Sequence, residues 1–322
     1  MHRMRNLLRG LIGITLLVTA MLVYSQQEPQ FSHNMFNHVL VNPGFAGMND
    51  AISATGIVRQ QWVGLRDAED NNISPETFLL SVDATVPLLR GGIGGTILQD
   101  QIGFFTINGF KIGYSYHHRT PKGRLGIGLQ VGLLNHQLDG TRFNPVSGAD
   151  PILNQLQGGE LSNMMADFSA GVFYEVQGQF YVGLSSSRIM QTSSQIGEGE
   201  DARVNFRRHY YLTGGYQFPF PGNNDYQVLP SVFIKSDGSS VQFDLNTSVV
   251  YKERFWGGMS YRHQDAIVML VGLTLNELKI GYSYDIPLSA IGGFGSHEIM
   301  VNYSFKLELE KERKSFRNTR FL

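Results

Sequence analysis

Leu125-Gly126-Ile127-Gly128-Leu129-Gln130-Val131-Gly132-Leu133 decides the fold of this chain. Every odd position of the stretch is aliphatic, and the positions between are glycine or glutamine. Because successive side chains of a β-strand point to opposite faces, the stretch has one apolar face and one small or polar face. It predicts a strand that separates an apolar environment from a polar one.

The same alternation recurs along the chain from residue 51 to residue 305, for example in 110–117, 278–285 and 299–305. Breaking the pattern at turn residues predicts about fourteen strands. Their expected spans are 51–62, 77–88, 92–100, 105–118, 123–138, 165–176, 180–187, 203–218, 226–235, 241–251, 255–262, 265–275, 277–284 and 295–305.

Composition favours a membrane protein that crosses with strands. Charged residues make up 16% of the chain, whereas an ordinary soluble domain has about 25%. Beyond Ser25 no segment approaches the ~20 consecutive apolar residues that a spanning helix needs. A net charge of −1 gives no long-range attraction to nucleic acid, so we expect outer-membrane lipid, and no nucleic acid, as a partner.

The connections between the expected strands separate by length. The long ones are 63–76, 139–164, 187–202 and 285–294, and all four are odd in order. An up-and-down barrel of an even number of strands has long loops on one side of the membrane and short turns on the other. We therefore predict an all-β, transmembrane, antiparallel barrel over residues 51–305. A soluble secreted β-sandwich, which would bury the apolar face, is the competing fold.

Three segments lie outside the predicted barrel. Residues 1–25 carry basic residues, an apolar run and a small Ser25, the layout of an export signal; a retained membrane anchor is the alternative. Residues 26–50 lack strand alternation and are expected to form an ordered plug, or a strap along the periplasmic rim. Residues 306–322 form a basic tail. An even strand number places both termini in the periplasm, with the barrel integral to the outer membrane.

The sequence gives little reason to expect catalysis. His117, His118, His209 and His263 could join Asp265 or Asp100 in a metal or protease site, but no pair has helical ligand spacing. The chain has no cysteine, which excludes thiolate metal sites. We therefore expect no enzyme activity, no cofactor and no metal.

Two further patterns have ordinary explanations. Gly126-Ile127-Gly128 begins like a dinucleotide fingerprint, but Val131 stands at the third glycine position and the context is all strand. Trp62 and Trp256 fit interfacial aromatic belts, or pack against the N-terminal segment. The polar side chains that we expect on the inner face of the barrel are Asp83, Lys111, Gln130, Asp167, Glu175, Asp244 and Asp285.

Several motifs resemble those of one family. They are 29–37 (PQFSHNMFN), 41–47 (VNPGFAG), 59–64 (RQQWVG), 100–103 (DQIG) and 281–285 (GYSYD) leading to 295–299 (GSHEI). Together they resemble the PorP/SprF family of outer-membrane barrels of the Bacteroidetes type IX secretion system, some of which serve gliding motility. The resemblance implies contacts with periplasmic ring lipoproteins and secreted cargo, and it implies no catalytic residues.

The function expected from these observations is a non-catalytic barrel of the type IX secretion and gliding machinery, which links a secreted surface adhesin to periplasmic ring partners. A porin or small-solute transporter is the alternative. The residues expected to bind partners lie in the N-terminal segment, at Trp62 and in the tail. They are Phe31, Met35, Phe36, Asn42, Pro43, Trp62, Arg313, Lys314, Arg317 and Arg320.

Overall fold

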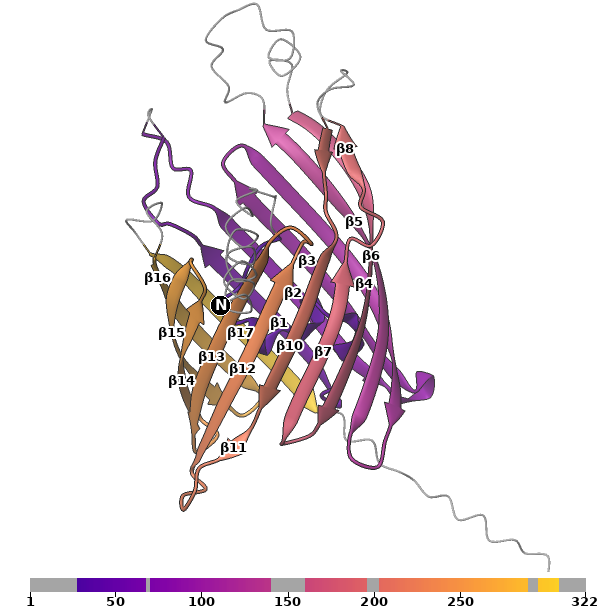
Figure 1. Cartoon of the computed structure of the whole chain (residues 1–322), viewed down its shortest axis with the longest axis vertical. Helices are drawn as coiled ribbons and strands as arrows, with labels where there is room; N and C mark the ends of the chain where they lie inside the picture. The colour runs from indigo at the N-terminus through magenta and orange to yellow at the C-terminus, as the bar shows by residue number, and fades with distance from the viewer. Residues whose placement is uncertain (1–27, 68–69, 140–159, 196–202, 289–294, 307–322) are drawn as a thin grey trace, which may run out of the picture.

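The computed structural model describes residues 28–67, 70–139, 160–195, 203–288 and 295–306. Within these residues, fourteen antiparallel strands close into one barrel, because the first wall strand pairs with the last (Figure 1). The wall strands are β1 (Ala51–Gln60), β2 (Glu76–Val86), β3 (Gly91–Ile102), β4 (Phe105–Arg119), β5 (Arg124–Asp139), β6 (Glu160–Val176), β7 (Phe180–Ser187), β10 (His209–Tyr216), β12 (Tyr226–Ser236), β13 (Val241–Tyr251), β14 (Phe255–Arg262), β15 (Ala266–Leu275), β16 (Leu278–Pro287) and β17 (Ser296–Lys306).

The wall follows the order of the chain, each strand pairing with its neighbours in sequence. The ring closes along β1 and β17, from Ala51 opposite Lys306 to Gln60 opposite His297. Closure leaves no unpaired sheet edge in the described wall, so its backbone N–H and C=O groups are satisfied without water. The prediction of an up-and-down barrel of about fourteen strands is confirmed.

One expected strand is wrong. Residues 203–218 do not form a single wall strand: β9 (Arg203–Asn205) pairs with β8 (Ser193–Gln195) in a separate two-stranded sheet. The wall strand β10 begins only at His209. The break between β9 and β10 begins at Phe206. Its side chain is buried, and its backbone N–H donates to the carbonyl of Thr192 and not to a neighbouring wall strand. After β10, the two-residue β11 (Phe218–Pro219) pairs with the start of β12.

The outer surface of the wall is apolar and the inner surface polar. Leu129 is 68% exposed and Val271 is 58% exposed, whereas the adjacent Gln130 and other inward residues are buried. This is the reverse of a soluble sandwich, in which the aliphatic face would be packed between sheets, and it is the pattern of a lipid-facing wall. Of the seven expected inner-face residues, six are buried and Glu175 is half-buried.

The two ends of the barrel differ in their connections. The connections of residues 61–75, 140–159, 188–208 and 288–295 all lie at one end, here called the loop end. The other end, the turn end, has connections of four residues or fewer except 217–225. The predicted segregation of long and short connections is thus confirmed. Within these connections, residues 68–69, 140–159, 196–202 and 289–294 lie outside the described residues.

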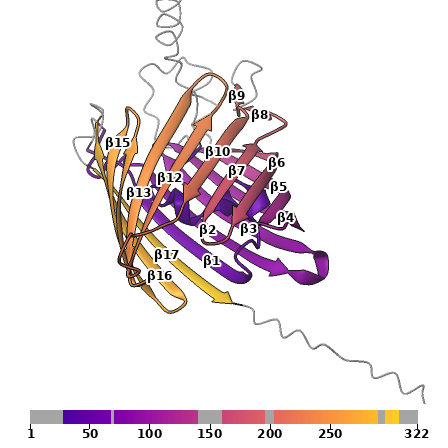
Figure 2. The same cartoon turned by 60° about the horizontal axis from the view of Figure 1, so that its bottom comes forward.

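Residues 28–50 lie inside the ring of strands (Figure 2). They contain three short 3-10 helices, η1 (Asn34–Phe36), η2 (His38–Leu40) and η3 (Pro43–Phe45). A fourth, η4 (Pro87–Leu89), forms the turn between β2 and β3. No helix in the described part of the chain has the length and apolar character to cross a bilayer. Residues 28–50 are called the plug below.

Candidate functional site: the plug and its seat in the barrel

The plug runs through the lumen towards the turn end. Glu28 lies near the loop-end halves of β7, β10 and β12, since it contacts Ser187, Tyr211 and Lys235. The chain then crosses to β16 and β17 and descends to Asp50, from which it enters β1 at the turn end. The plug therefore contacts wall strands on opposite sides of the barrel.

One end of this crossing is fixed at the seam between β1 and β17. The backbone N–H groups of Ser32 and His33 each donate to the Glu298 carboxylate at 2.8 Å, and His33 Nδ1 lies 2.7 Å from Glu298 Oε1. Arg59 pairs with Glu298 at 3.1 Å and with Asp285 at 2.8 Å. All five residues are buried. We call them the seam cluster.

Arg262 on β14 extends this network. Its guanidinium lies 3.1 Å from Asp285 and 3.4 Å from Asp244. The plug adds two amide donors to Asp244: Gln30 Nε2 at 3.0 Å and Asn34 Nδ2 at 3.2 Å. Buried ion pairs contribute little net stability, but removal of one partner leaves an uncompensated charge. The network therefore fixes where the plug sits.

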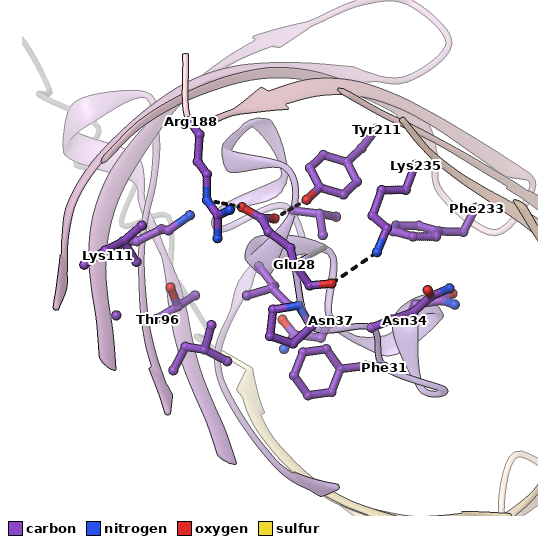
Figure 3. A pocket seen from close by; sticks show the side chains of 17 residues that line it. Glu28, Phe31, Asn34, Asn37, Thr96, Lys111, Arg188, Tyr211, Phe233 and Lys235 are labelled. Carbon is purple, nitrogen blue, oxygen red and sulfur yellow. Dashed lines mark hydrogen bonds and ion pairs between the residues drawn. The ribbon is translucent and has the colours of Figure 1, made fainter. Parts of the chain in front are cut away.

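The other end of the crossing is fixed through Glu28 (Figure 3). Its carboxylate pairs with Arg188 at 3.0 Å and accepts hydrogen bonds from Ser187 and from the Tyr211 hydroxyl. Lys235 Nζ donates to the Glu28 carbonyl at 3.1 Å. Burial raises the pKa of the Glu28 carboxyl, but Arg188, the other nearby cations and the Tyr211 hydroxyl outweigh burial and hold the pKa far below its ordinary value. Glu28 is therefore a buried carboxylate anchor.

Glycines on the inner face of the wall make room for the plug backbone. A Cβ on Gly128 would lie 2.2 Å from the carbonyl carbon of Pro43, and one on Gly126 would lie 2.0 Å from the Gly44 oxygen. On β3, a Cβ on Gly92 would lie 2.2 Å from the Ala46 oxygen. The small face that defined the sequence pattern at 125–133 is thus a seat for η3.

Asn42 joins η3 to the wall at the same place. Its side-chain oxygen accepts from the N–H of Gly44 at 2.9 Å and caps η3, while its Nδ2 donates to the Val172 carbonyl at 3.0 Å. An added Cβ on Gly171 would lie 2.2 Å from Asn42 Oδ1. The amide thus fills a space that only a glycine in β6 leaves open.

The middle of the plug packs through aromatic rings. Phe31 is buried in an apolar cluster with Trp256, and Met35 and Phe36 pack against that cluster. The ring centroids of Phe36 and Trp256 lie 4.8 Å apart. Gly272 is required beside them, because a Cβ there would lie 2.1 Å from the indole. Of the two placements expected for Trp256, the structure has the packing against the N-terminal segment.

The residues predicted to bind partners do not all lie in one place. Those of the plug, from Phe31 to Pro43, lie together in the lumen. Trp62 is half-buried at the loop end, where its backbone N–H donates to Ser296 Oγ at 3.2 Å. The four tail residues, Arg313, Lys314, Arg317 and Arg320, lie outside the described residues. Partner binding by the whole set stays a prediction.

Two cavities adjoin the plug. One, of about 40 Å³, lies beside Glu28 between the plug and the inner wall (Figure 3). The other, of about 130 Å³, lies at the turn end. Its plug side is formed by Met35 and Phe36, and its wall side includes Tyr181, Leu229 and Glu175. Met35 and Phe36 are thus the predicted partner residues that border a cavity at the turn end.

The histidines considered for catalysis do not form one cluster: His117 and His118 are neighbours on β4, with His118 exposed, and His209 and His263 lie on other parts of the wall. His117 Nε2 lies 2.9 Å from the Ala46 carbonyl, His209 contacts the Arg207 carbonyl, and His263 stacks on Phe243. In the part of the chain that the structure describes, no group of three or more His, Cys, Asp or Glu side chains could hold a metal ion.

Sequence reasoning missed most of the anchoring residues. Asp244 and Asp285 were expected on the inner face, but Glu28, Arg59, Arg262 and Glu298 were not singled out. A charged residue at an inward position of a strand was the available signal for the last three, since such a charge requires a buried partner. The identity of the partner could not follow from it.

Comparison with known proteins identifies the family. Residues 23–303 match the family described as Type IX secretion system membrane protein PorP/SprF. No curated protein matches the chain.

Among solved structures, the chain is similar to the Pseudomonas putida toluene transporter TodX, with 12% identity over 84% of this chain and 94% of that chain and a TM-score of 0.47. It is also similar to the Ralstonia pickettii toluene transporter TbuX, with 13% identity, coverage of 82% and 92%, and a TM-score of 0.46. A KdgM porin matches at 13% identity over 79% of this chain and 99% of that chain, with a TM-score of 0.38. At these values the likeness does not extend to ligands or activity. The family match covers nearly the whole barrel and the plug, and the chain therefore belongs to the PorP/SprF family of type IX secretion system membrane proteins.

Proposed function

We propose that this outer-membrane barrel is a non-catalytic linker of the type IX secretion and gliding machinery, which connects a secreted adhesin at the cell surface to periplasmic ring lipoproteins. The observation that carries the proposal is the plug, which crosses the lumen and is held at both ends by buried charges. A lumen filled in this way favours a scaffold for protein contacts over a path for free solutes.

The two ends of the barrel suit two different partners. In outer-membrane barrels, long loops face the exterior and short turns face the periplasm. On that orientation, the loop end meets cargo, and the turn end, where β17 ends, meets the periplasmic machinery. The turn-end cavity bordered by Met35 and Phe36 offers an apolar contact to such a partner. The basic tail of residues 306–322 adds charge for a second contact.

Single-channel recording distinguishes this proposal from the porin alternative. The purified mature protein in a planar bilayer should show no steady conductance, because the plug remains seated. A Gly128→Leu variant should conduct, since the larger side chain displaces η3. Steady open pores in the unaltered protein would favour a porin or small-solute transporter instead.

Co-purification tests the linking role. Membranes are solubilised in mild detergent, the barrel is captured, and its partners are identified by mass spectrometry. Removal of residues 307–322 should leave barrel insertion intact and reduce recovery of periplasmic partners. Charge-neutral replacement of Arg313, Lys314, Arg317 and Arg320 should have the same effect. Unchanged recovery in both variants would exclude the tail from the contact.

A further inference from the structure

The turn between β2 and β3 presents leucine side chains on the outside of the barrel. Leu88 of η4 is 92% exposed and Leu89 is 51% exposed. Figure 1 shows this turn as the purple coil at the lower right, which stands out sideways from the wall. The Tyr114 hydroxyl on β4 donates to the Leu89 carbonyl at 2.6 Å. The turn is therefore held in an outward position by a neighbouring strand.

Basic side chains surround these leucines. Arg90 follows η4 directly, and the adjacent turn between β4 and β5 provides Arg119 and Lys122, all three exposed. Neither 87–90 nor 117–124 contains an acidic residue. Asp50, a carboxylate at this rim, already pairs with Arg124 at 2.6 Å. We call Leu88, Leu89, Arg90, Arg119 and Lys122 the basic corner.

The other turns at this end do not repeat the arrangement. The turn between β13 and β14 has two cations, Lys252 and Arg254, but Glu253 lies between them and Asp225 lies 3.8 Å from Lys252. The turns 177–179 and 276–277 contain no basic residue. In a chain of net charge −1, positive charge at the described turn end is therefore concentrated beside the exposed leucines.

We propose that the basic corner binds anionic phospholipid, with the cations at the headgroup phosphates and the leucines among the acyl chains. Two observations choose lipid as the occupant. The corner continues the lipid-facing surface, on which Tyr114, Tyr116 and Ile93 point outward from the same strands. Its charge is also complementary to anionic headgroups, which attract basic residues close to a membrane surface.

Apolar and basic side chains placed side by side suit the interface between membrane and water. The apolar groups enter the hydrocarbon, while the cations remain at the level of the headgroups. The proposal needs only the barrel in its membrane. It adds a lipid contact to the proposed linking role and does not depend on which cargo or ring protein is bound.

Fluorescence quenching tests the proposed lipid contact. The chain has no cysteine, so a single introduced cysteine can be labelled selectively. The full mature protein carrying Leu88→Cys is labelled with acrylodan and reconstituted in phosphatidylcholine vesicles. Brominated phosphatidylglycerol or brominated phosphatidylcholine is then included at equal mole fraction. We expect the phosphatidylglycerol to quench the probe at least twofold more strongly. The excess should disappear in Arg90→Glu/Lys122→Glu, and it should persist in Arg254→Glu, which reverses an exposed cation elsewhere at the turn end.

A second probe, at Leu129→Cys on the middle of β5, should be quenched equally by both lipids. Equal quenching at residue 88 would overturn the preference for anionic lipid. Absence of quenching there, with normal quenching at residue 129, would place the corner in water and favour a protein partner. Because the readout involves neither conductance nor co-purification, its failure is distinguishable from failure of the proposed function.

Discussion

Arg59 on β1 and Glu298 on β17 stand opposite each other in the strand pair that closes the barrel, and their charged atoms lie 3.1 Å apart. The same Glu298 carboxylate accepts two backbone N–H groups from the plug. One buried carboxylate thus takes part both in closing the ring and in seating the plug, so the two events are coupled.

Replacement of this carboxylate should therefore weaken the whole structure. Glu298→Gln removes the charge that compensates Arg59, and loss of one partner of a buried ion pair costs about 3 kcal/mol or more. The free energy of unfolding in urea, measured in detergent micelles, should fall by that amount. Glu76→Gln, at an exposed strand end, should change it by less than about 0.5 kcal/mol; equal effects of the two variants would contradict the coupling.

The second prediction concerns the inner-face glycines that make room for the plug, and it adds an atom where the first removes a charge. Gly128→Ala places a Cβ against the backbone of Pro43, and overpacking of this kind costs about 1–3 kcal/mol. Urea unfolding should detect the loss. Gly56→Ala is the matched control, since a Cβ on that strand glycine would have no heavy atom within 4 Å. If Gly128→Ala were as stable as Gly56→Ala, η3 would not occupy this seat.

The outer wall should tolerate charge according to depth. Leu129→Arg places a cation on the middle of the lipid-facing wall and should make folding into vesicles less favourable by about 2–4 kcal/mol. Phe180→Arg, at the turn-end edge of β7, should cost about 0–1 kcal/mol. Reversible folding into phospholipid vesicles measures both values. Equal costs at the two positions would mean that the membrane does not cover β5 as the wall indicates.

His38 makes seating of the plug dependent on pH. It lies among Phe45, Phe173 and Tyr181, with ring centroids 4.8–5.3 Å away. Burial lowers its pKa from 6.5 to about 4. The unfolded state therefore binds the proton more readily, so stability is complete above pH 6.5 and falls as the pH drops towards 4.

The loss from His38 should reach about 3 kcal/mol, since one pKa unit corresponds to about 1.4 kcal/mol. Urea unfolding at pH 7.5 and pH 4.5 should show it as a difference between the unaltered protein and His38→Phe, which share every other titrating group. The same pH response in both proteins would exclude His38 as its source.

The wall could be predicted from the sequence because strand alternation is a local property. Leu129 and Gln130 point to opposite faces whatever the rest of the chain does. The break at Phe206 was missed for a related reason: an aromatic residue continues the strand pattern, and its burial depends on contacts with Leu134 of β5 and Met165 of β6, which are distant in the sequence. Alternation therefore identifies strands but does not show which of them join the ring.

The plug seat could be predicted only in outline. Ser32 and Glu298 are separated by 266 residues and meet because the ring closes, a step that sequence spacing does not reveal. The glycines at 126 and 128 were expected to face a polar interior. That they face the backbone of Pro43 and Gly44 depends on the path of the plug, which has no periodic pattern of its own.

A disulfide between plug and wall tests the position of the plug most directly. A Cβ on Gly94 would lie 3.1 Å from the Cβ of Ala46, close to the separation of about 3.5–4.5 Å in disulfides, and the chain has no other cysteine. Ala46→Cys/Gly94→Cys should cross-link almost completely on mild oxidation in intact outer membranes, while Ala46→Cys/Gly56→Cys should not. Barrels that fold and insert normally but leave both thiols of the first pair free would show that the plug lies outside the lumen.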